Sequence, residues 1–298
     1  MGTSTNAYLS TAGSASYVNP TLWSEAIEQV ARETTIIEPL GVLDNRALGS
    51  AGVQINIAKN QAFTAAQLTE GTATPVTTMA FGQVTVTFEE YGLAKQIGIA
   101  QLEYGLKAVF NDTTSNMGTA LSELKDQIII DALDEGAANT RYADATTSGS
   151  ISATNVFSTD LIAEGVTTMR TEKRPSQYLI VHPYCENSLL KDSQFIDASK
   201  YGGREVVMTG EIGRYLGLKV FSTTHINSAT ENSVTVYKNL LLGPRSFVIA
   251  YKRKVRLQWK EDSVLDRAIT FAADEHYGFS VLNSESIVVL KAVTGVGQ

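Results

Sequence analysis

The stretch GQVTVTFEEYG, Gly82–Gly92, decides the fold because it reads as a strand whose partner is not obvious. Val84, Val86 and Phe88 alternate with polar residues, and this period of two predicts a strand with one buried face. The nearest upstream strand is predicted at 52–58, and a Thr/Ala-rich stretch without a core pattern separates the two. The question is which surface covers the apolar face.

The predicted hairpin has an unusually long connection. Its second strand is predicted over 83–99, and the irregular tip around TEGTATPV is punctuated by Pro75. Connections beyond ~12–15 residues are usually functional or disordered. A two-stranded ribbon is only marginally stable in water, so this one needs a further surface. That surface is either its own domain or another copy of the chain.

Composition narrows the class of protein. The 298 residues are 43% hydrophobic, and their net charge of −7 argues against a general nucleic-acid coat. A single cysteine, Cys185, excludes an internal disulfide framework and a cysteine-rich zinc site. No apolar run is long enough to cross a bilayer, and no signal sequence is predicted. The charged fraction of 18%, against about 25% in ordinary domains, favours broad protein–protein contacts, with a mildly unusual monomer as the alternative.

Two helices are predicted before the middle of the chain. After a Ser/Thr/Ala-rich arm, Asn19 and Pro20 open a short amphipathic helix. The second and longer helix is SNMGTALSELKDQIIIDALDEG, which Gly136 is expected to end as a C-cap. Its predicted apolar stripe is Met117, Leu121, Leu124, Ile128 and Ala132, broadened by Ile129 and Leu133. Its charged residues, among them Lys125 and Asp126, are expected on a solvated face or an intersubunit salt-bridge surface.

A Ser/Thr/Ala/Gly linker is predicted at 143–157, and helices then alternate with strands. A helix capped near Ser158 should bury Ile162, Val166 and Met169. QYLIVH predicts a strand buried on both faces, PYCENSLLKD a short helix and EIGRYLG a further helical turn. LKVFSTT, VTVY, SFVIAY and SIVVLKAV predict the remaining strands.

Signatures of catalysis are nearly absent. GEIGRYLG is neither a dinucleotide fingerprint nor a P-loop. His182 and Cys185 could form a thiolate–imidazole pair or a metal site, which would suit a soluble α/β enzyme. A helix-capping histidine and a buried cysteine are the plainer interpretation. We therefore predict no catalytic residue, no cofactor site and no metal site.

A basic stripe is predicted in YKRKVRLQWK. In a strand, Lys252, Lys254 and Arg256 point to one face, opposite Leu257 and Trp259. This stripe is a candidate inner face toward packaged nucleic acid, or else a plain solvated face.

The order of these parts, with QYLIVHPYCENSLLKDSQF and GEIGRYLGLKVFSTTHI, resembles the major capsid proteins of tailed bacteriophages with the Hong Kong 97-like fold. The resemblance implies an α+β fold with an N-terminal arm, a long extended β-hairpin loop, a peripheral domain with a long spine helix, and an α/β axial domain. The expected divisions are arm and short helix 1–48, extended loop 49–100, peripheral domain 101–157 with 251–285, and axial domain 158–250 with 286–298.

The function implied is a structural subunit that assembles through pentamers and hexamers into an icosahedral shell around double-stranded DNA. Scaffolding, portal and cement proteins are further expected partners, the DNA contact is non-specific, and no membrane is involved. The expected location is the virion capsid, assembled in the host cytoplasm. An encapsulin-like nanocompartment shell is the alternative within the same fold.

The resemblance also answers the opening question, because the extended loop would lie over an adjacent subunit. The residues expected at that intersubunit contact are Glu70, Phe81, Val84, Val86, Phe88 and Glu90.

Overall fold

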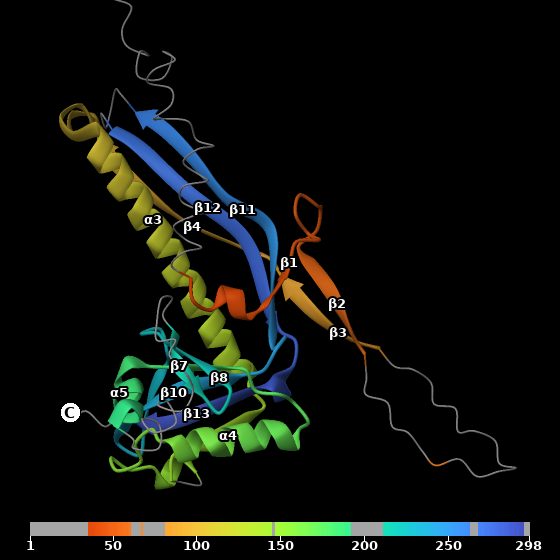
Figure 1. Ribbon diagram of the computed structural model, residues 1–298. Coiled ribbons are helices and arrows are strands. Elements are labelled where there is room, and N and C mark those ends of the chain that lie inside the picture. The colour runs from red at the N-terminus through yellow and green to blue at the C-terminus, as the bar shows by residue number, and fades with distance from the viewer. Residues whose placement is uncertain are drawn as a thin grey trace, which may run out of the picture.

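The computed structural model describes residues 35–60, 67, 81–144, 147–191, 211–262 and 268–294. The predicted N-terminal helix and the tip of the hairpin, with Glu70, lie outside these residues. The described chain forms a four-stranded sheet, a seven-stranded sheet and a two-stranded ribbon. Figure 1 shows the ribbon projecting from the side of the molecule, away from the two larger sheets.

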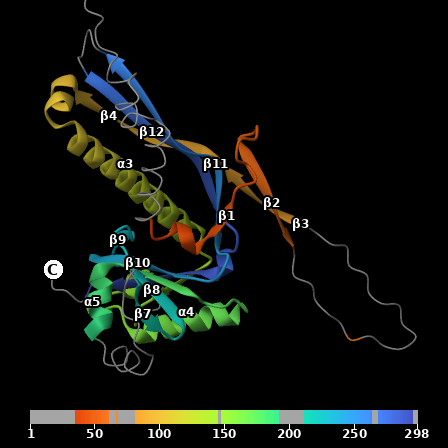
Figure 2. The same ribbon diagram turned by 45° about the horizontal axis from the view of Figure 1, so that its top comes forward.

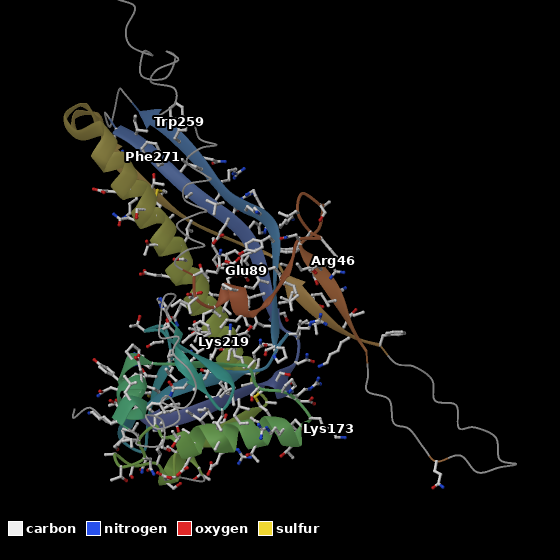
Figure 3. All side chains as sticks on the ribbon, in the orientation of Figure 1. Arg46, Glu89, Lys173, Lys219, Trp259 and Phe271 are labelled. Atoms are coloured by element: carbon white, nitrogen blue, oxygen red, sulfur yellow. The ribbon has the colours of Figure 1, made fainter. Side chains whose placement is uncertain are left out.

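The four-stranded sheet has the order β1–β11–β12–β4, and a long helix, α3, packs on it. Its strands are β1 (Val42–Asp44), β4 (Glu89–Gly98), β11 (Phe247–Asp262) and β12 (Ala268–Val281). The 38 residues of α3 (Ile99–Gly136) make a helix ~57 Å long. Met117 and Leu121 pack against Leu257 and Phe271, so the helix covers one face of the sheet. Figure 3 shows Phe271 beside Trp259 at the far end of that sheet.

The buried stripe of α3 differs from the predicted one. Leu124 is 41% exposed, whereas Lys125 and Asp126 are almost fully buried. The stripe follows the expected helical period, but two of its positions carry charged side chains that are paired inside the protein. Hydrophobicity alone therefore placed the stripe slightly off its true position around the helix.

Gly136 ends α3, but not as the predicted C-cap. The capping residue is Ala137, in an extended conformation. A Cβ atom on Gly136 would lie 2.6 Å from Cγ2 of Val281. Glycine is therefore suited to this position because helix and strand approach closely, and not because of a left-handed turn.

The seven-stranded sheet has the order β5–β13–β10–β6–β8–β7, and β9 pairs with β10. Its strands are β5 (Asn139–Tyr142), β6 (Tyr178–Val181), β7 (Glu211–Tyr215), β8 (Leu218–Ser222), β9 (Ser228–Glu231), β10 (Val234–Leu242) and β13 (Ile287–Val293). The helices α4 (Thr159–Thr171) and α5 (Pro183–Lys191) contribute to the core on one face. Leu179 and Val181 face that core, while Ile180 faces a second core that includes Ile129 and Ile130 of α3. The predicted double burial of QYLIVH is thus confirmed.

The predicted helical turn in EIGRYLG is wrong. This segment is β7, which forms a hairpin with β8 through Leu216 and Gly217. These two residues have φ angles of 51° and 81°, the left-handed values that a two-residue hairpin turn requires. In the sequence, the glycines of this segment resemble those that end helices, but Gly217 lies in the turn of a β-hairpin.

The predicted linker at 143–157 is not a free linker in its described residues, which exclude 145 and 146. Ala143, Ile151 and Phe157 are completely or almost completely buried, and Val156 forms a bridge with Val293 of β13. The Ser/Thr-rich composition hid these buried positions. The chain has therefore joined the seven-stranded sheet by the start of β5.

Candidate functional site

The ribbon consists of β2 (Gln54–Asn60) and β3 (Phe81–Thr87), paired antiparallel from Gln54–Thr87 to Asn60–Phe81. The strand of the opening stretch therefore has a partner within its own chain, as the hairpin prediction required. Directly opposed residues share a face of a sheet. One face of the ribbon accordingly carries Ile55, Ile57, Lys59, Val84 and Val86.

The base of the ribbon is buried within its own subunit. Val86 is 0% exposed and Phe88 6% exposed, and both pack with Ala47, Val248 and Ala250. The expectation that these two side chains meet a neighbouring copy is therefore corrected. They lie at the end of the strand nearer the body of the subunit, where β11 and the segment before β2 cover them. Only the part of the strand beyond them projects from the subunit.

A close backbone approach secures this base. A Cβ atom added to Gly278 of β12 would lie only 2.1 Å from the carbonyl oxygen of Thr87. Because glycine has no Cβ, the backbone at Thr87 can pass this close to β12. The backbone N–H of Phe88 also donates to the carbonyl of Val53, at 2.9 Å.

The outer part of the ribbon is exposed. Phe81 is 65% exposed, Val84 is partly exposed, and Lys59 is exposed. Glu90, at the start of β4, has an exposed side chain that forms an ion pair with Arg253. That ion pair holds the pKa of Glu90 below its usual value. Of the predicted contact residues that are described, Phe81, Val84 and Glu90 thus remain accessible.

The segment 45–53, which we call the elbow, leads from β1 into β2 and is held by polar contacts. The Arg46 guanidinium donates to the Asp44 carboxylate from Nε and Nη2, and these hydrogen bonds lower the pKa of Asp44. Figure 3 shows Arg46 where the elbow meets the ribbon. The Lys252 ammonium donates to the carbonyl of Gly52, and the Gly49 N–H donates to the carbonyl of Lys252. These contacts fix the direction in which the ribbon leaves the body.

A buried charge network lies beneath the elbow. The Lys125 Nζ lies 3.4 Å from an oxygen of Glu38 and 3.1 Å from an oxygen of Glu275, and it donates to the Tyr251 hydroxyl at 3.2 Å. The Tyr251 hydroxyl in turn donates to Glu38 at 2.6 Å. All four side chains line or border a cavity of about 380 Å³, which Thr35, Leu43 and Lys254 also line. The network joins the short 3₁₀ turn Glu38–Leu40 to α3, β11 and β12.

Asp126 anchors the same segment. Its carboxylate accepts hydrogen bonds from the backbone N–H groups of Ile36 and Ile37, at 3.0 and 3.3 Å. Burial raises the pKa of Asp126 to about 6, and the two N–H donors oppose that rise. Lys125 and Asp126 therefore attach the chain before β1 to the C-terminal half of α3. The predicted solvated or intersubunit role of these two residues is wrong.

The network escaped prediction although the sequence held a signal for it. Lys125 and Asp126 continue the helical series of Met117, Leu121 and Ile129. A charged residue at such a position has two explanations. Either the apolar stripe lies slightly to one side and the residue faces solvent, or the residue is buried and paired with an opposite charge inside the protein. Its partners Glu38 and Glu275 are distant in sequence, so nothing local identified them.

The predicted basic stripe is largely engaged within the subunit. Leu257 is buried and Val255 and Trp259 are partly buried, which confirms the apolar face of β11. Arg256 forms an ion pair with Asp274 at 3.2 Å, and Lys252 binds the Gly52 carbonyl. Register shifts around Arg253 bring Arg253 and Arg256 to the same Asp274. Lys254, which borders the cavity, is exposed.

His182 and Cys185 are arranged for packing. The His182 Nδ1 accepts the backbone N–H of Tyr184 at 3.2 Å, and the imidazole stacks on Tyr237 with ring centroids 4.3 Å apart. Burial raises the pKa of the Cys185 thiol to about 11. A nucleophile needs the thiolate, which this environment disfavours. The geometry therefore supports the capping and filling roles.

Two further features of the described residues bear on function. No group of three or more His, Cys, Asp or Glu side chains in this part of the chain is placed to hold a metal ion. Among the described helices, none combines the length and hydropathy needed to cross a bilayer.

Comparison with known proteins connects this geometry to a family. The sequence matches the family described as "Phage capsid protein" over residues 82–290. No curated protein sequence is significantly similar.

Solved structures share the fold at low sequence identity. The capsid of Ralstonia phage GP4 is 13% identical with a TM-score of 0.68, over 90% of this chain and 93% of that chain. The Mycobacterium phage Che8 structure is 18% identical with a TM-score of 0.64, over 86% and 90%. The virus-like particle from Pyrococcus furiosus is 15% identical with a TM-score of 0.59, over 92% and 99%.

Proposed function

Because the chain belongs to the phage capsid protein family and has the Hong Kong 97-like fold, we propose that it is the major subunit of an icosahedral shell built from pentamers and hexamers. The protein is a structural component of a virion capsid. The observation that carries the proposal is the ribbon, whose base is buried in its own subunit and whose outer part is exposed.

The exposed outer part of the ribbon suits a head-to-tail contact. A ribbon of two strands has no sheet neighbour of its own and is marginal in water. If its outer part lies on the next copy, each copy both gives and receives a ribbon. Such heterologous contacts close into rings when the rotation allows it. Phe81, Val84, Glu90 and, in the tip, Glu70 belong to this proposed contact.

The energy of one contact is modest. A few hundred Å² of apolar surface per copy, at ~25 cal/mol per Å², gives several kcal/mol before ordering costs. A closed ring sums these contacts around its circumference. Assembly is therefore expected to be steeply concentration-dependent.

The cargo proposed is double-stranded DNA, held by non-specific contacts. The net charge of −7 is unfavourable for tight binding of phosphates, so any attraction would be local. The stripe of Lys252, Lys254 and Arg256 remains a candidate for it, weakened by the internal contacts of Lys252 and Arg256. Scaffolding, portal and cement proteins are proposed partners, and the host cytoplasm is the proposed place of assembly.

A nanocompartment shell of the same fold is the second candidate; one structure with this fold, from Pyrococcus furiosus, is described as a virus-like particle and not as a phage capsid. The content of particles from the natural source separates the two. Double-stranded DNA supports the virion, and an enclosed protein cargo without DNA supports the nanocompartment.

The first experiment is electron microscopy with light scattering on the protein expressed alone. Closed particles or rings of five and six copies are expected. A variant for comparison replaces residues 61–80 by Asn-Gly, because Asn60 and Phe81 are paired and a two-residue turn can join them. This variant should fold but not assemble. A wild-type protein that stays monomeric at every concentration, with and without a co-expressed scaffold, would contradict the proposal.

A further inference from the structure

The seven-stranded sheet ends at β5, and no strand in the described part of the chain pairs with the outer side of β5. On its inner side, the Ala143 N–H just after β5 donates to the carbonyl of Lys291 in β13. Because the direction of the backbone groups alternates along a strand, the N–H and C=O groups of Thr140 and Tyr142 point away from β13. The outer side of β5 therefore offers backbone donors and acceptors to a further strand.

A groove of about 870 Å³ lies between this edge and one side of α4. The side of α4 that lines the groove carries Asp160, Glu164, Thr167 and Thr171, which are exposed and recur at helical spacing. The helix belongs to the core on one face of the sheet, whereas α3 belongs to the core on the other face. Figures 1 and 2 accordingly show α4 on the side of the seven-stranded sheet that lies away from the four-stranded sheet.

The groove is acidic. Its charged lining consists of the carboxylates of Asp144, Asp160 and Glu164 and the guanidinium of Arg141. The Arg141 Nε donates to the Thr168 hydroxyl at 2.9 Å, which holds this side chain against the wall of the groove. Three carboxylates against one cation favour an occupant with positive charge.

The dimensions of the groove suit an extended peptide. The four residues of β5 span ~13 Å at the rise of a strand. The helix rises ~16 Å between Asp160 and Thr171. An extended segment of about five residues would therefore pair with β5 along its whole length and pass both acidic residues of α4.

The long stretches of the chain outside the described residues do not match this groove in charge. These stretches are 1–34, 61–80 apart from residue 67, and 192–210, and none of them has a net positive charge. In the basic stripe of β11, Lys252 and Arg256 are engaged within the subunit. Charge complementarity therefore favours an occupant from a second protein.

We propose that the groove between β5 and α4 binds an extended segment of a second protein that is rich in lysine or arginine. The segment adds a strand to the outer side of β5 and places its cations against Asp160 and Glu164. This inference goes beyond the proposed function, because the groove lies within one subunit and needs neither a ring nor a shell.

Peptide binding to the full-length protein tests the inference. The probe is a short fluorescein-labelled peptide of alternating lysine and valine, titrated with protein and followed by fluorescence anisotropy. One control peptide has glutamate in place of each lysine. A second control keeps the lysines but has proline in place of each valine, so that it lacks the N–H groups that a strand needs. Only the lysine–valine peptide should bind, and more weakly at high salt.

Two variants test the two halves of the groove separately. Glu164→Lys reverses a charge on α4 and should raise the dissociation constant on the order of fivefold. Its matched control is Glu123→Lys on α3, which is exposed outside the groove and should bind as the wild type does. Thr140→Pro removes an N–H that points away from β13 and should also raise the dissociation constant on the order of fivefold. Urea unfolding verifies that each variant is folded.

The outcomes separate this inference from the proposed function. Weaker binding in both groove variants, with unchanged binding in Glu123→Lys, supports the groove whether or not the protein forms particles. Absence of binding to the wild type, or binding that neither groove variant changes, would overturn the inference and leave the shell intact. Binding to free subunits that is lost in assembled particles would assign the groove to a contact between copies, and would overturn the second protein as its occupant.

Discussion

Lys125→Met should destabilise the isolated subunit strongly. The substitution keeps the length of the side chain but removes the ammonium that contacts Glu38, Glu275 and Tyr251 within 3.4 Å. Two buried carboxylates then face each other's field without a counter-charge. Removing one partner of a buried ionic network costs ~3–5 kcal/mol. At ~2–4 °C per kcal/mol, the melting temperature should fall by ~6–20 °C.

The measurement is urea unfolding of the assembly-deficient subunit, followed by fluorescence and circular dichroism. Lys260→Met is the matched control, since Lys260 is exposed on β11 and its loss should change the free energy of unfolding by less than ~0.5 kcal/mol. Adding Glu38→Gln and Glu275→Gln to Lys125→Met should recover most of the loss, because no buried charge is then left unpaired. A loss below ~1 kcal/mol for Lys125→Met would refute the reasoning that these charges are coupled inside the fold.

Three other outcomes follow from the geometry. Gly278→Ala should destabilise the base of the ribbon by ~3 kcal/mol or more, because its Cβ would meet the backbone of Thr87, whereas Gly149→Ala, with open space around it, should be nearly neutral in urea unfolding. For Asp126, the folded pKa of about 6 lies above the reference value of 3.8, so the folded state binds the extra proton between them. The free energy of unfolding should therefore fall by ~3 kcal/mol as pH rises from about 4 to 7, and a titration of Asp126→Asn should lack that fall. Cys185 should resist a thiol reagent in the native subunit and react fully in urea; rapid native labelling would contradict its burial.

Sequence periodicity was sufficient to predict the buried face of an element wherever a strand or helix buries only apolar side chains on that face. QYLIVH predicted a strand buried on both faces, which is confirmed. Val84, Val86 and Phe88 predicted one half-buried strand over 83–99; the burial of Val86 and Phe88 is confirmed, but the strand is divided at Phe88 into β3 and β4, which belong to different sheets. The surface that covers this apolar face was predicted wrongly. The same alternation of apolar and polar residues runs through the buried base and through the exposed outer part of the ribbon, so it does not distinguish the two. A local sequence pattern does not indicate the residue at which a strand leaves its own domain.

The remaining errors have specific physical causes. The helical turn expected in EIGRYLG is a hairpin. Its turn requires a left-handed backbone conformation at Leu216, and a leucine does not indicate such a conformation in the sequence. The stripe of α3 was misplaced because paired charges at Lys125 and Asp126 look like solvent-facing residues. Their partners lie about 90 and 150 positions away along the chain, where helical spacing carries no information.

The ribbon connects folding and assembly through a single strand face, and its two parts should respond differently to mutation. Val86 is packed by its own subunit, so its truncation should lower stability first and assembly only as a consequence. Lys59 and Val84 lie beyond the buried base, so changes there should leave the unfolding free energy of the subunit nearly unchanged. The network of Lys125 and Glu38 holds the turn Glu38–Leu40 against α3, β11 and β12. The contacts of Arg46 with Asp44 and of Lys252 with Gly52 hold the elbow from which the ribbon departs. A shell subunit needs this separation, because a contact surface that also stabilised the monomer would be buried before any second copy arrived.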